Sequence, residues 1–186
     1  MTEQKPIMPS RAYATEYGTF LGVAWVIVFA LYVLGICNMN MLFMFMACIG
    51  ICMLPFVAFY FAWRYKQHLE PGEKLPFFSA WMFSIMMFVY ACLLTGAVEY
   101  VYFAYMDDGA LLGQFYSVLE DEETIKLYKQ MGLSETLGVL RESLDEMSKL
   151  SPLDMALMLF NQNFFMSIIL SFPTAFVASM KSKRKG

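Results

Sequence analysis

Four long runs of apolar residues, separated by polar segments, dominate the pattern along this chain. Each run is close to or longer than the roughly 20 residues that an α-helix needs to cross the hydrocarbon of a bilayer. The pattern therefore predicts an all-α integral membrane protein with four transmembrane helices, at about 18–37, 41–63, 77–106 and 151–180. We expect the polar leader 1–17 to stay attached, and residues 181–186 form a basic tail.

Polar residues between the runs predict how the spans are connected. Asn38 and Asn40 flank a short turn without charge, so the first two spans should form a helical hairpin. Pro55 lies inside the second span and should kink it, which a bundle can accommodate. Ser151 and Pro152 fit the cap and the first position of a helix, so the fourth span should begin there.

Residues 107–150, which we call the acidic segment, form the only long stretch of the chain suited to water. An acidic run, Glu-Asp-Glu-Glu at 120–123, is followed by Lys126, Lys129 and Gly132. Acidic residues favour the start of a helix and basic residues its end, so this pattern predicts one short helix that ends at Gly132. Glu122 and Lys126 have the spacing of a favourable ion pair on one helix face.

A second short amphipathic helix is expected after Ser134, which can cap it. Its apolar positions repeat at steps of three and four residues and form one stripe: Leu137, Leu140, Leu144 and Met147. One interpretation is that the stripe packs against the first short helix or the membrane surface. The other is that it is a docking face for a helix of a partner protein.

Composition agrees with a membrane protein, and the distribution of charge suggests its orientation. Of 186 residues, 59% are hydrophobic and 16% charged, whereas a soluble domain is nearer half apolar and a quarter charged. Basic residues beside spans mark the cytoplasmic side. We therefore expect both termini in the cytoplasm and the acidic segment outside, because the leader, the middle loop and the tail hold Lys5, Arg11, Arg64, Lys66, Lys74, Lys181, Lys183, Arg184 and Lys185.

One acidic residue, Glu99, lies inside an apolar run, and an ionisable group there is a candidate functional residue. Counted from Phe77, it lies roughly 33 Å along the third span. Counted back from Lys181, the residues Asn161, Gln162 and Asn163 lie roughly 27–30 Å along the fourth span, at nearly the same height. We expect Glu99 to meet Asn161 or Asn163, with Thr95 one turn below. The favoured interpretation is a polar clasp between helices, worth about 1 kcal/mol, and the alternative is a proton- or ligand-binding site.

Gly18 and Gly22 lie one turn apart at the start of the first span. This spacing of small residues lets two helix backbones approach closely in lipid. Two glycines in an apolar run also occur by chance, so the pattern is a weak indication of helix packing.

Groups needed for catalysis are missing from the pattern. The sequence has no Gly-x-Ser-x-Gly nucleophile motif, no phosphate-binding loop and a single histidine, His68. We expect neither an enzyme nor a cofactor, and a short basic tail does not indicate nucleic-acid binding.

Metal binding is a weaker interpretation than packing for the sulfur-containing residues. The chain has 17 methionines and four cysteines, and Met39, Met41, Met44 and Met46 lie near Cys37 and Cys48. Such ligands suit Cu(I), but methionine is also a common flexible filler of apolar interiors. The acidic run 120–123 lacks the spacing and glycine of a calcium loop. We therefore expect no metal site and, with every cysteine inside an apolar run, no disulfide framework.

Short motifs along the chain resemble a known family. Tyr17-Gly18 and Gly22 open the first span, a polar segment precedes the last, and Ser171-Phe172-Pro173 leads into the basic tail. Together they resemble a family of bacterial four-pass inner-membrane proteins, the domain of unknown function number forty-one ninety-nine. The resemblance implies a Gram-negative inner membrane and periplasmic exposure of the acidic segment. It implies no activity and no site residues.

Two functional hypotheses follow. The first is a non-enzymatic accessory or interaction protein of the inner membrane that presents the acidic segment to the periplasm. The alternative is a small oligomeric transporter or channel with Glu99 as its coupling carboxylate. Candidate partners are the lipid bilayer, a membrane or periplasmic protein, and further copies of the chain. The exposure of the Glu99 side chain distinguishes the two hypotheses, because a transporter needs Glu99 to face a cavity that is reachable from both sides of the membrane.

Overall fold

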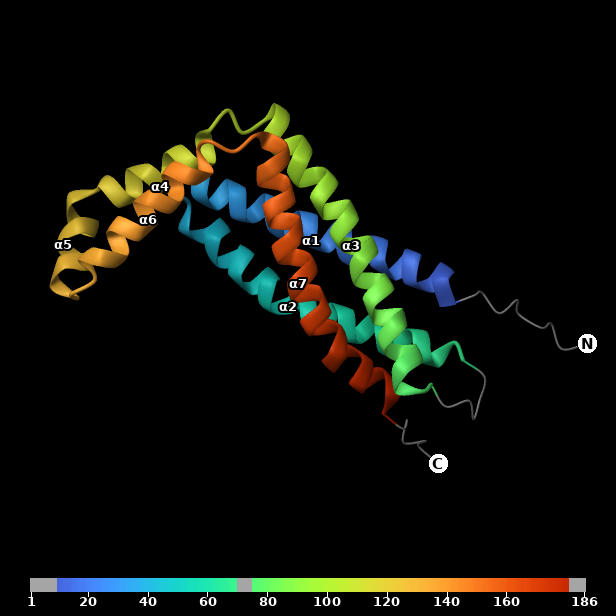
Figure 1. Cartoon of the computed structure of the whole chain (residues 1–186). Helices are drawn as coiled ribbons and strands as arrows, with labels where there is room; N and C mark the ends of the chain where they lie inside the picture. Colours follow the sequence, from blue (N-terminus) through green and yellow to red (C-terminus); the bar gives the residue numbers. More distant parts are fainter. Residues whose placement is uncertain (1–9, 70–74, 181–186) are drawn as a thin grey trace, which may run out of the picture.

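The computed structural model describes residues 10–69 and 75–180, and that part of the chain forms helices and no strands (Figure 1). Four helices are long and apolar enough to cross a membrane: α1 (Ser10–Cys37), α2 (Met41–Gln67), α3 (Phe77–Tyr105) and α7 (Pro152–Ser179). Between α3 and α7 come three shorter helices: α4 (Ala110–Glu120), α5 (Glu122–Gln130) and α6 (Ser134–Met147). The predicted fold class, all-α with four spanning helices, is confirmed.

The four long helices form a bundle with two distinct ends. At one end, the terminal end, α1 and α3 begin and α2 and α7 finish (Figure 1). At the opposite end, the distal end, the turn between α1 and α2 lies near the junctions of α3 with α4 and of α6 with α7 (Figure 1). The helices of the acidic segment project sideways from the distal end.

Helix α1 begins at Ser10, so residues 10–17 of the predicted leader are helical. Residues 10–17 are helical because their aromatic side chains pack on the end of α2. The ring of Tyr17 stacks on that of Phe61 at 5.1 Å between centroids, and the ring of Tyr13 lies 5.7 Å from that of Tyr65. Residues 1–9 and the basic tail 181–186 lie outside the described residues. Helix α2 likewise extends beyond the expected 63 to Gln67.

The expected helix starts at Asn40 and Ser151 are present. The backbone N–H of Leu42 donates to Asn40 Oδ1 at 3.0 Å, which caps α2 directly after a turn in which Met39 has φ +49°. The backbone N–H of Asp154 donates to Ser151 Oγ at 3.2 Å, and Pro152 occupies the first turn of α7. These caps satisfy backbone donors that a helix start leaves without partners.

The acidic segment holds three helices, and the prediction of one or two was too few. Helix α4 was missed because it carries no charge before Glu120 and follows Gly109, whose φ is +77°. Ser134 does not cap α6 as expected. The capping position is Leu133, which makes no side-chain bond, and Ser134 is the first helical residue.

Helix α3 lies at the centre of the bundle, where it packs most extensively on α7 and then on α1. Alanines are frequent in the core of the bundle, and Ala58, Ala80, Ala91 and Ala175 are fully buried there. Small side chains allow helix backbones to approach closely, and in lipid such packing drives association because there is no hydrophobic effect between helices.

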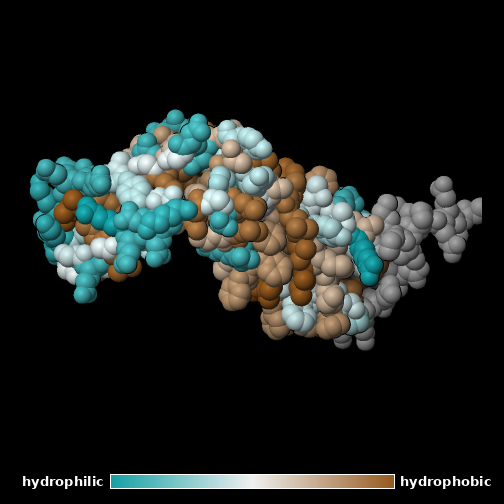
Figure 2. All heavy atoms as spheres, turned by 45° about the horizontal axis from the view of Figure 1, so that its top comes forward, coloured by the Kyte–Doolittle hydropathy of each residue, from teal (hydrophilic) through white to brown (hydrophobic). Residues whose placement is uncertain are grey.

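A separate apolar cluster joins the acidic segment to the distal end of the bundle. It brings together Ile36 of α1, Phe103 of α3, Leu112 of α4, Leu144 of α6 and Met155 of α7. Figure 2 shows the result on the surface, with hydrophobic residues over the bundle and hydrophilic residues over much of the projecting helices. The acidic segment is thus fixed to the spans by its apolar side, while its charged side faces outward.

Candidate functional site

Glu99 and Asn163 contact each other across the interface of α3 and α7. The Asn163 side-chain amide Nδ2 donates to Glu99 Oε1 at 3.1 Å. Glu99 is only 3% exposed, so this carboxyl group is enclosed by protein. The hydrogen bond joins the centre of the bundle to its last helix, as a polar clasp would.

The other residues expected near Glu99 do not join this contact. The Thr95 hydroxyl donates to the Ala91 carbonyl at 2.9 Å on its own helix, as serine and threonine often do in membrane helices. Asn161 and Gln162 are exposed. Among the described residues, the second carboxyl oxygen, Oε2 of Glu99, has no hydrogen-bond partner. A buried water molecule would satisfy such an oxygen.

Two further polar contacts between α3 and α7 were not predicted. The Cys92 Sγ and Ser167 Oγ atoms lie 3.2 Å apart, and the Trp81 indole Nε1 donates to Ser171 Oγ at 3.0 Å. With the Glu99–Asn163 pair they form a ladder of three contacts along the interface. The signal in the sequence is the spacing of Asn163, Ser167 and Ser171, one every four residues, which places all three on one face of α7.

Gly18 and Gly22 lie where α1 crosses α3, inside the chain. A Cβ atom added at Gly18 would lie 2.6 Å from the backbone oxygen of Met87, and one at Gly22 would lie 3.1 Å from Ala91 Cα. The two glycines therefore permit the approach of α1 to α3. They are not exposed for contact with a second copy of the chain, since both are buried.

A network around Tyr102 fixes the start of α4 against the bundle. The Tyr102 hydroxyl donates to Asp107 Oδ1 at 2.7 Å, and the same oxygen accepts the backbone N–H of Leu111 at 3.1 Å. Tyr102 is thus turned inward. Tyr100 and Tyr105, at the same end of α3, are exposed, as interfacial tyrosines are.

Two polar contacts tie α4 to α6. The Tyr116 hydroxyl donates to Asp145 Oδ1 at 2.6 Å, and the Arg141 guanidinium donates to the Leu119 carbonyl at 3.1 Å. The hydrogen bond to Asp145 raises the pKa of Tyr116 above its usual value. These bonds join α4 to α6, so the two helices form one paired unit.

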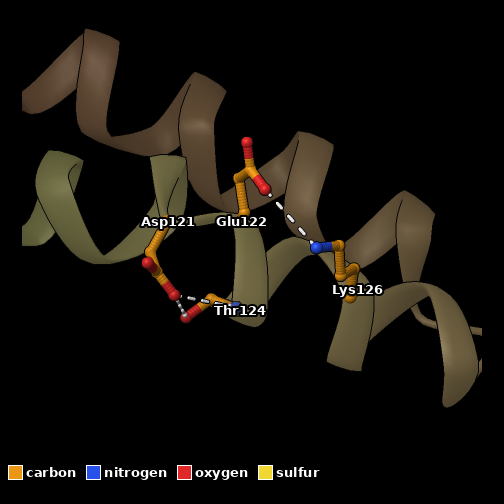
Figure 3. A network of polar contacts seen from close by, with 4 residues as sticks. All are labelled: Asp121, Glu122, Thr124 and Lys126. Carbon is orange, nitrogen blue, oxygen red and sulfur yellow. Dashed lines mark hydrogen bonds and ion pairs between the residues drawn. The ribbon is translucent and has the colours of Figure 1, made fainter.

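The acidic run 120–123 is the start of helix α5 (Figure 3). Asp121 Oδ2 accepts the backbone N–H of Thr124 at 3.0 Å and therefore caps the helix. Lys126 Nζ lies 3.4 Å from Glu122 Oε2, so the expected ion pair is present, with both side chains mostly in solvent. Across residues 10–69 and 75–180, no three His, Cys, Asp or Glu side chains gather where a metal ion could be held.

The stripe on α6, for which docking of a partner helix was one of two interpretations, faces mainly into the chain. Leu137 and Leu144 are each 8% exposed, and Leu144 and Met147 belong to the apolar cluster at the distal end. Leu140 alone is open, at 37%. Leu144 and Met147 pack on α4 and on the bundle, whereas the packing interpretation had named the first short helix or the membrane surface.

Comparison with known proteins gives a single result. A family model described as "Protein of unknown function (DUF4199)" matches residues 16–179, from the first turns of α1 to the end of α7. No curated protein and no solved structure matches the chain.

Proposed function

Since the chain belongs to the DUF4199 family of proteins of unknown function, only its own residues indicate a role, and we propose a non-catalytic accessory protein of a bacterial inner membrane. In this proposal both termini are cytoplasmic. The acidic segment stands in the periplasm and binds a basic segment of a membrane or periplasmic protein.

The orientation is supported by the basic residues at the terminal end. Arg11 lies in the first turn of α1, and Arg64 and Lys66 lie in the last turn of α2. Basic residues beside spans favour the cytoplasmic side, and acidic residues have little influence. The acidic segment is at the opposite end of the bundle (Figure 1) and is therefore assigned to the periplasm.

The observation that carries the proposal is the division of the acidic segment into a packed side and a charged side. Some of its apolar residues pack on the bundle, whereas others, such as Leu127, Met131 and Val139, stay exposed, and acidic residues outnumber basic ones on its outer surface. Nine exposed acidic residues lie in the segment: Asp108, Glu120, Asp121, Glu122, Glu123, Glu135, Glu142, Asp145 and Glu146. Two of the four basic residues are already engaged, Lys126 with Glu122 and Arg141 with the Leu119 carbonyl.

A fixed surface of one charge attracts a partner of the opposite charge, mainly by raising the association rate and excluding wrong partners. The α4–α6 bonds and the apolar cluster hold this surface in one orientation relative to the membrane. A rigid acidic surface close to the membrane therefore suits the basic flank of another membrane protein.

The transporter hypothesis has less support. It needs Glu99 to meet water or substrate during a cycle, and this residue is 3% exposed and bonded to Asn163. We therefore assign Glu99 to the polar clasp between α3 and α7.

The test compares variants that change the charge of the acidic segment in opposite directions. Glu120→Gln, Glu122→Gln and Glu123→Gln together neutralise three exposed carboxylates and leave the Asp121 cap intact. Lys126→Gln with Lys129→Gln makes the segment more acidic and serves as the matched control. The protein is extracted gently from its own membranes and its complexes are weighed by native mass spectrometry at increasing salt.

We expect a stoichiometric protein partner with the natural chain, lost as salt rises. Exposed charges contribute about 0.5 kcal/mol each, so the triple change should weaken the complex about tenfold. The lysine variant should hold its partner at least as well. A partner retained equally by the triple variant, or a chain with no protein partner, would contradict the proposal.

A further inference from the structure

An apolar cavity of about 470 Å³ lies at the distal end, in the angle between the acidic segment and the bundle. Residues of α1, α3, α4, α6 and α7 line it. They include Phe29, Phe103, Phe115, Leu140, Met158 and Gln162. Its volume falls in the range of roughly 300–1,000 Å³ that is typical of ligand pockets.

We propose that this cavity binds one acyl chain of a phospholipid from the adjacent leaflet. On α1 the lining extends to Phe29, eight residues or about 12 Å from the distal end of the helix. On α7 it extends to Gln162, about 15 Å from the start of the helix. These depths are about half of the roughly 30 Å hydrocarbon thickness, which is the depth of one leaflet.

The position of the cavity identifies the class of ligand. Tyr32 and Met158, on the spanning helices, line the cavity and are also exposed to the surroundings of the bundle. At this depth those surroundings are lipid chains. An apolar cavity that opens beside hydrocarbon is filled by hydrocarbon because water would gain few hydrogen bonds in it.

One polar group in the outer half of the wall suits the ester region of such a lipid. Within the described residues, the Tyr32 hydroxyl, five residues or about 8 Å from the distal end of α1, forms no hydrogen bond with another residue. Apolar pockets commonly fix their ligands by a small number of such groups. Helix α6, which covers the cavity, also carries Glu142, Asp145 and Glu146, so a headgroup with an ammonium should be preferred to an anionic one.

The test fills the cavity by substitution. Ser143 lines the cavity from α6, and its hydroxyl bonds only to the Val139 carbonyl of its own helix. Ser143→Phe therefore adds an apolar group to the cavity at little cost to other contacts. Ser117→Phe is the matched control. Ser117 is exposed on α4, its hydroxyl bonds only to Gln114 of the same helix, and it does not line the cavity.

Delipidated protein in detergent is mixed with phosphatidylethanolamine or phosphatidylglycerol and analysed by native mass spectrometry. We expect one tightly held phosphatidylethanolamine, an affinity at least tenfold lower for Ser143→Phe, and no change for Ser117→Phe. Equal binding by the three proteins, preference for phosphatidylglycerol, or no tightly held lipid would overturn the proposal. Circular dichroism verifies that each variant keeps its helices.

A second measurement uses the natural chain alone. Phosphatidylethanolamine with a photoreactive group at the end of one acyl chain is added, and the cross-linked peptides are identified. Labels concentrated at the deep end of the cavity, around Phe29 of α1 and Gln162 of α7, would support the site. Labels spread evenly over lipid-facing residues of α2, such as Phe56, would contradict it. Neither measurement involves a protein partner, so its outcome is independent of the proposed accessory role.

Discussion

At the scale of single residues, the pair of Glu99 and Asn163 shows what a polar group does inside this bundle. The interior offers each polar side chain few partners, so a carboxyl group there is held by one amide from the neighbouring helix. Measured hydrogen bonds between membrane helices average about 0.6 kcal/mol and reach about 1.7 kcal/mol. The pair therefore specifies which face of α7 meets α3 more than it determines total stability.

A double-mutant cycle on this pair tests the clasp. Glu99→Leu, Asn163→Leu and the double variant should give a coupling energy of about 0.6–1.7 kcal/mol, measured by reversible unfolding in mixed micelles. Glu99→Gln should stay within about 0.5 kcal/mol of the natural chain, because its amide oxygen can still accept the hydrogen bond from Asn163. A Glu99→Gln variant as unstable as Glu99→Leu would show that the carboxylate itself is needed.

Gly18 is the second residue whose identity is set by a single contact. Gly18→Ala should destabilise the protein by about 1–3 kcal/mol, because the new Cβ would lie 2.6 Å from the Met87 backbone oxygen and the helices must move apart. Gly138→Ala on α6 is the control, since its Cβ would meet nothing within 4 Å. That change should stabilise by about 0.5–1 kcal/mol, as alanine favours a helix over glycine. The same unfolding measurement would contradict this account if both substitutions had the same sign.

At the scale of elements, the sequence predicted those helices whose existence depends on local pattern. The four spans follow from run length alone, and the cap at Ser151 follows from residue type. Helix α4 was missed because its apolar residues, such as Leu111 and Leu112, acquire their role only by packing on the distal end. The contacts of Trp81 and Cys92 with α7 were missed because these residues do not stand out within an apolar run.

The apolar stripe on α6 is a second example of what the sequence could not predict. Periodicity established that Leu137, Leu140 and Leu144 share a face, but it could not show what covers that face. The partner proved to be α4 and the bundle, which lie at other positions of the chain. The pattern of one helix does not show which other elements lie beside it in space. That information is needed to distinguish packing from docking.

Helix α5 has no buried residue and depends on its own start, so its cap can be tested in isolation. Asp121→Ala should remove about 1 kcal/mol from the local stability of α5, because the Thr124 N–H loses its acceptor. Hydrogen exchange of α5 amides should become about fivefold faster, while exchange in the bundle stays the same. Glu122→Gln is the control and should change little, since surface ion pairs contribute little. Faster exchange throughout the bundle would mean that α5 supports the whole fold.

At the scale of the whole molecule, one bundle carries two surfaces of opposite character. The spans present large exposed apolar side chains such as Phe20, Phe45 and Phe165, which suit lipid, and the acidic segment presents charge. The two meet at the distal end, where the apolar cluster and the Tyr102–Asp107 bond leave little freedom between them. The orientation of the bundle therefore decides which compartment the acidic segment meets.

Cysteine labelling tests this orientation. In a chain whose native cysteines are replaced, Thr136→Cys on α6 and Ser10→Cys at the start of α1 each introduce one exposed thiol. A membrane-impermeant maleimide added to spheroplasts should label Thr136→Cys at once and Ser10→Cys only after lysis. The reverse order of labelling would show that the acidic segment is cytoplasmic.

The ladder of contacts between α3 and α7 also bears on the order in which the bundle forms during synthesis. Ribosomes make α3 first, and Asn163 follows Glu99 by 64 residues. At roughly 5–20 residues per second, the third helix waits roughly 3–13 s for the partner of its carboxyl group. Until α7 has been made, the Glu99 carboxyl group lacks the Asn163 amide to which it bonds in the finished bundle. The ladder between α3 and α7 therefore forms only after the last helix has been synthesised.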